Sequence, residues 1–227
     1  MMRLAPFFID LGDPLYRMQL DMQIASAKRV MPDIEVVVLT DLKSDVSPYK
    51  TFRENVDKSH FTRDFLKLQS IFLKSTAFKP TLFTGTDSLF QKDIRPVFDQ
   101  SFDMAVTWRR IPEDMPINTG TVFIKNKNAA DLILEIYYKA YGIDNWFTDQ
   151  IAYYEVIGKR NSPPYLQTIF YKDYKILFLS ARIYNFAPKK NQLPARDEAA
   201  AILHFKGPRK YFMQRYWETY LCPRLPL

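Results

Sequence analysis

Residues 82–90 read Leu-Phe-Thr-Gly-Thr-Asp-Ser-Leu-Phe, a short apolar run followed by a polar loop that carries one acid. Pro80 breaks the preceding segment, so we expect a strand over Thr81–Phe83 that ends where the loop begins. Ligands of open α/β sheets bind at the carboxyl ends of strands. Asp87 therefore either holds a divalent cation or caps a turn or helix, and this stretch leaves both interpretations open.

Strand-like and helix-like segments alternate over the first two thirds of the chain, which is typical of a sheet with crossover helices. We predict strands at 6–10, 34–39, 81–83, 104–108, 121–125, 175–179 and 201–205, and helices at 15–30, 62–74, 129–141 and 149–157. The fold class is therefore α/β. We expect one domain over residues 1–207, with a basic aromatic helix and tail, residues 208–227, packed on it.

Length and composition narrow the class of protein. The chain has 227 residues, 47% of them apolar, which is enough for a buried core and excludes disorder as the main description. No apolar run approaches the ~20 residues of a membrane span, and the start shows no small-residue cleavage site. Cys222 is the single cysteine, so it forms no internal disulfide. We expect a cytoplasmic protein.

The net charge of +7 is concentrated near the end of the sequence. Residues 1–171 hold 21 basic and 21 acidic side chains, whereas residues 172–227 hold 11 and 4. Such an excess suits a nucleic acid, a polyanionic small molecule or an anionic membrane surface. The net charge does not distinguish these partners, so the distinction depends on the sequence motifs.

A second polar segment runs from Pro116 to Val122 and reads Pro-Ile-Asn-Thr-Gly-Thr-Val. We predict a turn here that leads into a strand. Asn118 can exchange hydrogen bonds with hydroxyl groups, and Gly120 permits a ligand to approach the backbone closely. Taken singly, an ordinary turn is the better explanation of these residues.

A third polar segment follows the strand predicted at 201–205. His204 is one of two histidines in the chain, and Lys206, Gly207, Arg209 and Lys210 come directly after it. Neutral imidazole is a good metal ligand, and cations around a glycine turn suit phosphate oxygens. The alternative is a core histidine beside solvated lysines.

In their order and character these segments resemble the GT-A-fold glycosyltransferases, especially the group similar to glycogenin and to the lipopolysaccharide galactosyltransferases. The resemblance covers residues 7 to about 211 and rests on the whole ordered set of motifs. It implies a single Rossmann-like domain with a mixed, mostly parallel central sheet flanked by helices. It also implies transfer of a sugar from a nucleotide-diphosphate donor, with UDP as the nucleotide of choice, to a hydroxyl group of a glycan or glycolipid.

The resemblance also implies roles for particular residues. Asp87 and His204 are expected to ligate Mn²⁺ or Mg²⁺ on the donor diphosphate, and Asp149 and Gln150 to lie at the transferred sugar and acceptor hydroxyl as the catalytic pair. Three alternatives stay open: Asp149 is the base of an inverting transfer, a retaining transfer uses donor-side assistance with Gln150 near the anomeric carbon, or Asp149 simply caps its helix. The remaining residues expected to bind substrate are Phe8, Asp10, Asp41, Arg63, Lys67, Asn118, Thr119, Gly120, Gly207 and Lys210.

One position departs from the family pattern. Gly85 stands where the first acid of the Asp-x-Asp motif is expected, so the chain reads Gly-Thr-Asp. The loss of one anionic ligand weakens cation binding and leaves three interpretations open: weaker metal dependence, compensation by the Thr84 or Thr86 hydroxyl and water, or lost activity.

Other functions compete with the transferase hypothesis. A binding module for nucleotide sugars or glycans that has lost catalysis is the main alternative. Nucleic-acid binding ranks lower, because the aromatic residues of the tail recur at helical spacing and suit a core. The same tail could touch an anionic membrane at the inner surface through Tyr211, Phe212, Arg215, Tyr216, Trp217 and Arg224. Residues 110–115 and 162–164 are candidate specificity loops.

Overall fold

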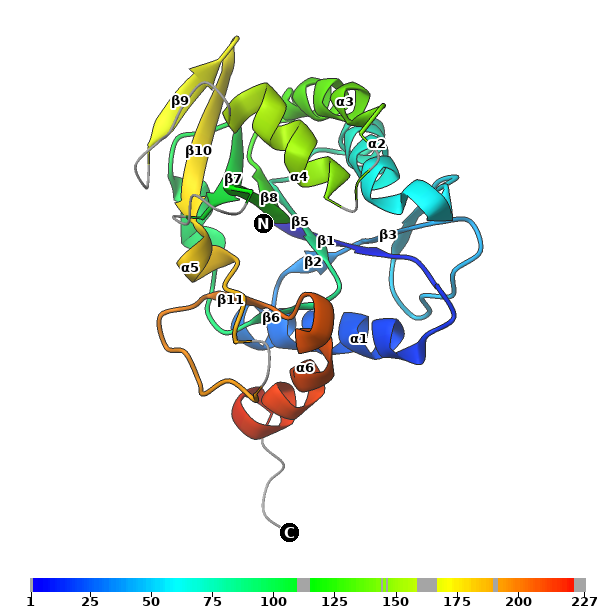
Figure 1. Cartoon of the computed structure of the whole chain (residues 1–227), viewed down its shortest axis with the longest axis vertical. Coiled ribbons are helices and arrows are strands. Elements are labelled where there is room, and N and C mark those ends of the chain that lie inside the picture. The colour runs from blue at the N-terminus through cyan, green and yellow to red at the C-terminus, as the bar shows by residue number, and fades with distance from the viewer. Residues whose placement is uncertain are drawn as a thin grey trace.

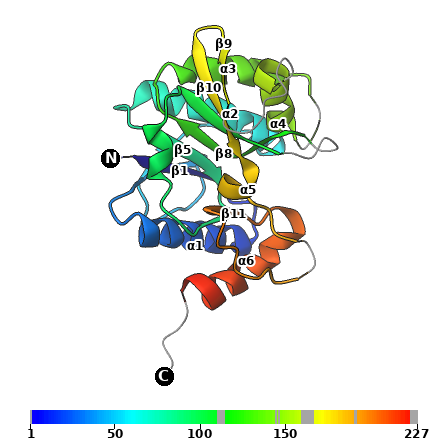
Figure 2. The same ribbon diagram turned by 90° about the vertical axis from the view of Figure 1, so that its left-hand side faces the viewer.

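A computed structural model describes residues 2–109, 115–143, 145, 147–158, 167–189 and 192–222 of the chain. Two α-helical groups cover opposite faces of a central sheet (Figures 1 and 2). Residues 110–114 and 162–164 of the candidate specificity loops, and Arg224 of the tail, lie outside the described residues. Within the described ranges, no helix is long and apolar enough to cross a membrane.

The central sheet is mixed and mostly parallel, as predicted. Its strands follow the order β4-β3-β1-β5-β8-β7-β10-β9, with β2 also pairing with β1. β8 runs antiparallel to both β5 and β7, and β9 antiparallel to β10, while the other pairs are parallel. The strands are β1 (Arg3–Phe8), β2 (Glu35–Val36), β3 (Val38–Thr40), β4 (Thr51–Arg53), β5 (Thr81–Gly85), β7 (Met104–Trp108), β8 (Ile117–Ile124), β9 (Thr168–Tyr171) and β10 (Tyr174–Ser180).

The longest helix, α1, begins where the local sequence favours it. The Asp13 carboxylate caps α1 by accepting a hydrogen bond from the Leu15 N–H at 2.9 Å, and Pro14 occupies the first turn. α2 follows a short 3₁₀ turn and buries its apolar face, including Phe65 and Phe72. The α-helices are α1 (Pro14–Val30), α2 (Phe61–Ser75), α3 (Ala129–Ala140), α4 (Thr148–Tyr153), α5 (Ala181–Tyr184) and α6 (Lys210–Tyr216).

The core lies in two layers, one on each face of the sheet. α2, α3 and α4 cover one face, and α1 covers the other (Figure 1). The first layer contains Phe83, Ile133 and Tyr153, and the second contains Leu82 and Met31. Neighbouring residues of β5 thus contribute to opposite layers, because side chains alternate across a strand.

A small second sheet connects the acidic loop to the end of the chain. β6 (Ser88–Phe90) pairs antiparallel with β11 (Ile202–His204), and the register places Ser88 opposite His204. α6 and a π-helical turn over Trp217–Leu221 follow and pack against this pair through Met213 and Tyr216, which are fully buried. The C-terminal segment therefore belongs to a core cluster of its own. Tyr216 lies in that core, whereas Tyr211 is 77% exposed.

The turn predicted at residues 116–120 is wrong, because Asn118, Thr119 and Gly120 lie inside strand β8. The β7–β8 register shifts between Val106 and Thr107, so this polar stretch of β8 forms an irregularity rather than a chain reversal. Asn-Thr-Gly has the local preferences of a turn, but pairing of β8 with β7 before and after Thr119 and Gly120 keeps this stretch in the strand. Strands β4, β6 and β9 were not predicted.

Candidate active site

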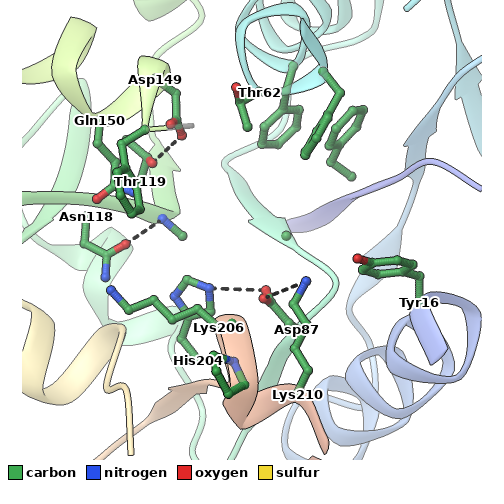
Figure 3. Close-up of a pocket in the computed structure, with 18 of the residues that line it drawn as sticks. Tyr16, Thr62, Asp87, Asn118, Thr119, Asp149, Gln150, His204, Lys206 and Lys210 are labelled. Carbon is green, nitrogen blue, oxygen red and sulfur yellow. Dashed lines mark hydrogen bonds and ion pairs between the residues drawn. The ribbon is translucent and has the colours of Figure 1, made fainter. Parts of the chain in front are cut away.

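A cavity of about 600 Å³ opens at the carboxyl ends of β1 and β5 (Figure 3). The starts of α1 and α2, the irregular part of β8, the start of α4 and the segment after β11 enclose it. Nine of the residues expected at the site line this one cavity: Asp87, Asn118, Thr119, Gly120, Asp149, Gln150, His204, Gly207 and Lys210. Segments far apart in the sequence therefore meet where the topology predicts a ligand site.

Asp87, His204 and Lys210 form the charged cluster of the cavity (Figure 3). His204 Nε2 lies 3.2 Å from Asp87 Oδ1, and Lys210 Nζ lies 3.7 Å from Asp87 Oδ2. The β6–β11 pairing causes the first contact, since the Phe205 N–H also donates to the Asp87 carbonyl at 2.7 Å. Gly207, with φ of +60°, turns the chain so that α6 can follow directly.

The charge state of Asp87 follows from this cluster. Burial alone would raise the pKa of its carboxyl group, because the charged form loses water. The charge and hydrogen bond of His204, together with the charge of Lys210, outweigh that effect and hold the pKa of Asp87 well below its usual range. Asp87 is therefore an anion held between His204 and Lys210.

Two features fix the position of the His204 ring. Asn185 Oδ1 lies 2.7 Å from His204 Nδ1, and Asn185 is itself buried. A Cβ on Gly120 would lie 2.5 Å from the ring atoms Cε1 and Nδ1, so only glycine leaves room for the ring. The close approach that we expected Gly120 to offer a ligand is taken by His204.

Asp149 and Gln150 approach the cavity from the first turn of α4 (Figure 3). The Thr119 hydroxyl donates a hydrogen bond to Asp149 Oδ2. Burial raises the pKa of Asp149, and the hydrogen bond from Thr119 opposes this effect. The site thus contains two carboxylates in different environments, Asp87 with its pKa lowered and Asp149 with its pKa raised.

The structure places three expected substrate-binding residues beside or beyond the cavity. Phe8 lines a smaller adjoining cavity of about 190 Å³. Asp10 is exposed, and its carboxylate accepts a hydrogen bond from the Gly12 N–H at 2.8 Å. Asp41 is buried and accepts the Ser44 N–H at 2.7 Å, so it stabilises its own loop.

Arg63 and Lys67 do not line this cavity. The Arg63 guanidinium pairs with Asp64 at 3.1 Å, stacks over Tyr141 and lines a second cavity of about 460 Å³. Lys67 is exposed on α2. The expectation that Arg63 and Lys67 bind substrate in this cavity is therefore not met by their positions on α2.

Several lining residues were not predicted. Phe7, Phe61 and Phe65 form an apolar wall, with the Phe7 and Phe65 rings stacked at 4.4 Å. Tyr16 lies under the Lys210 ammonium, which is 4.6 Å from the centre of the ring. Aromatic residues are common in cores, so neither spacing nor composition marks these as site residues.

The metal centre that the resemblance implies needs two acids and a histidine, and the residues present do not fit it. Gly85 supplies no side chain, and no three His, Cys, Asp or Glu side chains gather into a metal-holding group among the described residues. Asp87 and His204 are the two expected ligands that meet, and the Asp87 carboxylate already contacts Lys210.

Solved structures with a similar fold include two glycosyltransferases. A glycosyltransferase involved in glycosylation of the major capsid of PBCV-1 is 12% identical over 95% of this chain and 98% of that one, with a TM-score of 0.59. The galactosyltransferase LgtC, solved in complex with donor and acceptor sugar analogs, is 14% identical over 95% and 94%, with a TM-score of 0.57. No protein-family model and no curated protein matches the chain.

A third similar structure is the glycosyltransferase GlyE from Streptococcus pneumoniae TIGR4. It is 12% identical over 95% of this chain and 59% of that one, with a TM-score of 0.63. The chain thus has the fold of the GT-A glycosyltransferases, as the ordered motifs predicted. The PBCV-1 enzyme, LgtC and GlyE are three of the individual proteins to which it is similar.

Proposed function

We propose that this chain is a glycosyltransferase that moves a sugar from a nucleotide-diphosphate donor, first of all a UDP-sugar, to a hydroxyl group of a glycan or glycolipid. The observation that carries the proposal is the convergence of Asp87, His204 and Lys210 on the cavity that also contains Asp149 and Gln150. The fold shared with known glycosyltransferases supports it.

The charges of the cavity suit departure of a nucleoside diphosphate. Negative charge grows on the diphosphate as the glycosidic bond breaks, and fixed cations aimed at that charge lower the barrier. Lys206 and Lys210 line the same side of the cavity (Figure 3). Stabilisation of the leaving group is therefore the role proposed for this side.

Asp149 and Gln150 are proposed to act on the sugar and acceptor. A carboxylate with a raised pKa and a fixed hydroxyl partner is suited to accept or orient a hydroxyl proton. The amide of Gln150 is suited to hydrogen-bond the transferred sugar without adding charge. Asn118 and Thr119 border the same space and are proposed to contact sugar hydroxyls.

The direct test is hydrolysis or transfer from a panel of nucleotide sugars, followed by Lys210→Met. This variant keeps most of the aliphatic stem and removes the charge, so kcat should fall ~100-fold with little change in thermal unfolding. Lys127→Met, at an exposed site outside the cavity, is the matched control. Equal rates for the wild type and Lys210→Met on a confirmed donor would exclude the diphosphate role.

A binding module without catalysis is the second candidate, and Gly85 favours it because an acid expected for catalysis is missing. Calorimetry with UDP-sugars combined with a hydrolysis assay separates the two. Binding without turnover on every donor tested would favour the module. Measurable turnover, lost in Asp149→Asn, would favour the enzyme.

We also propose that exposed residues of the C-terminal segment contact an anionic membrane at its inner surface. Tyr211 and Arg215 are exposed and can reach a membrane, whereas Tyr216 is buried and cannot. Co-sedimentation with phosphatidylserine vesicles, compared between the wild type and Tyr211→Ser, would detect this contact.

A further inference from the structure

The carboxylates of the cavity are already engaged. Among the described lining residues there are three, Asp13, Asp87 and Asp149. Asp13 caps α1, and Asp149 accepts the Thr119 hydroxyl. Asp87 lies between His204 and Lys210 at 3.2 and 3.7 Å. Residue 85, where the family pattern places the first acid, is glycine and contributes no carboxylate to pair with Asp87 around a divalent cation.

The positive groups of the cavity come from one short segment. Lys206 and Lys210 flank the 3₁₀ turn Gly207–Arg209 and line the cavity on either side of His204 (Figure 3). Tyr16 lies under the Lys210 ammonium at 4.6 Å from the ring centre. Asp87 and Tyr16 together hold that ammonium at the lining of the cavity.

We propose that the cavity binds the diphosphate of its donor directly through Lys206 and Lys210, without a divalent cation. This inference rests on the proposed function. Asp87 then serves as the anchor that positions Lys210, rather than as a metal ligand.

The balance of charges gives the physical reason. A divalent cation at a phosphate site is held by one or two carboxylates whose negative charge is free to balance it, in addition to substrate phosphates and water. Here one carboxylate is available, and Lys210 already compensates its charge. A second cation at that point would be repelled by Lys210, whereas diphosphate oxygens would form charge-assisted hydrogen bonds with the ammonium groups.

Calorimetric titration with UDP tests the proposal on the whole chain. The expected Kd in EDTA lies within ~3-fold of the Kd in Mn²⁺. Loss of binding in EDTA that Mn²⁺ restores would overturn the proposal while leaving the proposed function standing.

Gly85→Asp and Gly85→Asn form a matched pair, equal in shape and different in charge. The backbone of Gly85 has no positive φ, and an added Cβ would meet only the end of the Asp87 side chain at 3.1 Å, so both variants should fold. In EDTA, Gly85→Asp should bind UDP at least ~10-fold more weakly than Gly85→Asn, and Mn²⁺ should recover binding in Gly85→Asp alone. Equal Kd values for the two variants in EDTA would contradict the proposal.

If the proposed function is wrong, no nucleoside diphosphate should bind, whether or not Mn²⁺ is present. If UDP, GDP, ADP and CDP all fail to bind the folded wild type with Mn²⁺ and with EDTA, both the function and this inference are wrong. Circular dichroism of each sample shows that the chain is folded in either case.

Discussion

The orientation of His204 depends on one buried amide. Asn185 Nδ2 donates to Thr107 Oγ1 at 2.9 Å and to the Asn118 carbonyl at 3.1 Å. Its Oδ1 must therefore accept the Nδ1 hydrogen of His204, while Nε2 is left to donate to Asp87 Oδ1 at 3.2 Å. Asn185 acts through His204 and is a positioning residue.

Asn185→Leu should release the ring of His204. We expect activity to fall ~10- to 100-fold, and unfolding to become easier by ~1–3 kcal/mol because the Asn118 carbonyl loses a buried donor. Nitrogen NMR of His204 should show a hydrogen-bonded Nδ1–H in the wild type and in Asn185→Asp, which keeps the acceptor, and loss of that hydrogen bond in Asn185→Leu. An unchanged Nδ1–H signal in Asn185→Leu would refute the positioning role.

Glu35 is a second residue whose environment has a measurable consequence. Hydrogen bonds from Lys50 and Lys79, with the charge of Arg3, outweigh burial and lower the pKa of Glu35 to about 2. Because the pKa of Glu35 is lower in the folded state, its ionised carboxylate stabilises the fold above the unfolded pKa near 4.5. This stabilisation is lost as the pH falls towards 2.

Glu35→Gln should therefore be less stable than the wild type at pH 7, by about 1–3 kcal/mol. The difference should shrink between pH 4.5 and 2. Urea unfolding of both proteins across this range measures it, and the comparison cancels the titration of the other acids. A difference independent of pH would show that Glu35 acts through shape rather than charge.

At the scale of elements, the β6–β11 pair builds the site and α6 supports it. The antiparallel register brings His204 next to the residue that follows Asp87. Tyr216 of α6 is fully buried, packs on Phe205 at 5.6 Å and donates its hydroxyl to Gln91 Oε1 at 2.7 Å. The C-terminal helix therefore holds the strand that carries His204.

Tyr216→Ala should destabilise the fold by ~3–5 kcal/mol, since it removes a buried aromatic ring. Tyr211→Ala, at a side chain 77% exposed on the same helix, should change stability by less than ~0.5 kcal/mol. Thermal unfolding of the two variants measures this contrast. Similar melting temperatures would mean that α6 does not support the core.

At the scale of the whole molecule, the cavity joins parts of the chain that the sheet holds together. Residues from β1, α2, β5, β8, α4 and the β11–α6 segment line it. A ligand that fills the cavity contacts all of these elements, so its binding free energy adds to the stability of the entire fold.

UDP at 100 times its Kd should stabilise the folded chain by ~2.7 kcal/mol, which raises the melting temperature by roughly 5–10 °C for a domain of this size. Uridine, which lacks the diphosphate, is the matched control and should give little shift. Differential scanning fluorimetry measures both. Equal shifts for UDP and uridine would place recognition in the base rather than in the diphosphate.

The sequence by itself determined the α/β class and most of the longer elements. The helix predicted at 62–74 is α2 (Phe61–Ser75), and the strand at 104–108 is β7 (Met104–Trp108). These predictions succeed because the spacing of apolar residues along the sequence directly indicates which side chains a helix or strand buries. The convergence of Asp87, His204 and Lys210 was expected only through the ordered resemblance.

The tertiary structure alone decided which polar residues share the cavity. Asn118 and Gly120 lie in a strand, and Arg63 lines a neighbouring cavity. Asn185, which was not predicted, is the partner of His204. Each of these facts depends on strand register and on contacts between distant segments. Local preferences carry no information about such contacts, because pairing energy between strands exceeds the turn preference of a few residues.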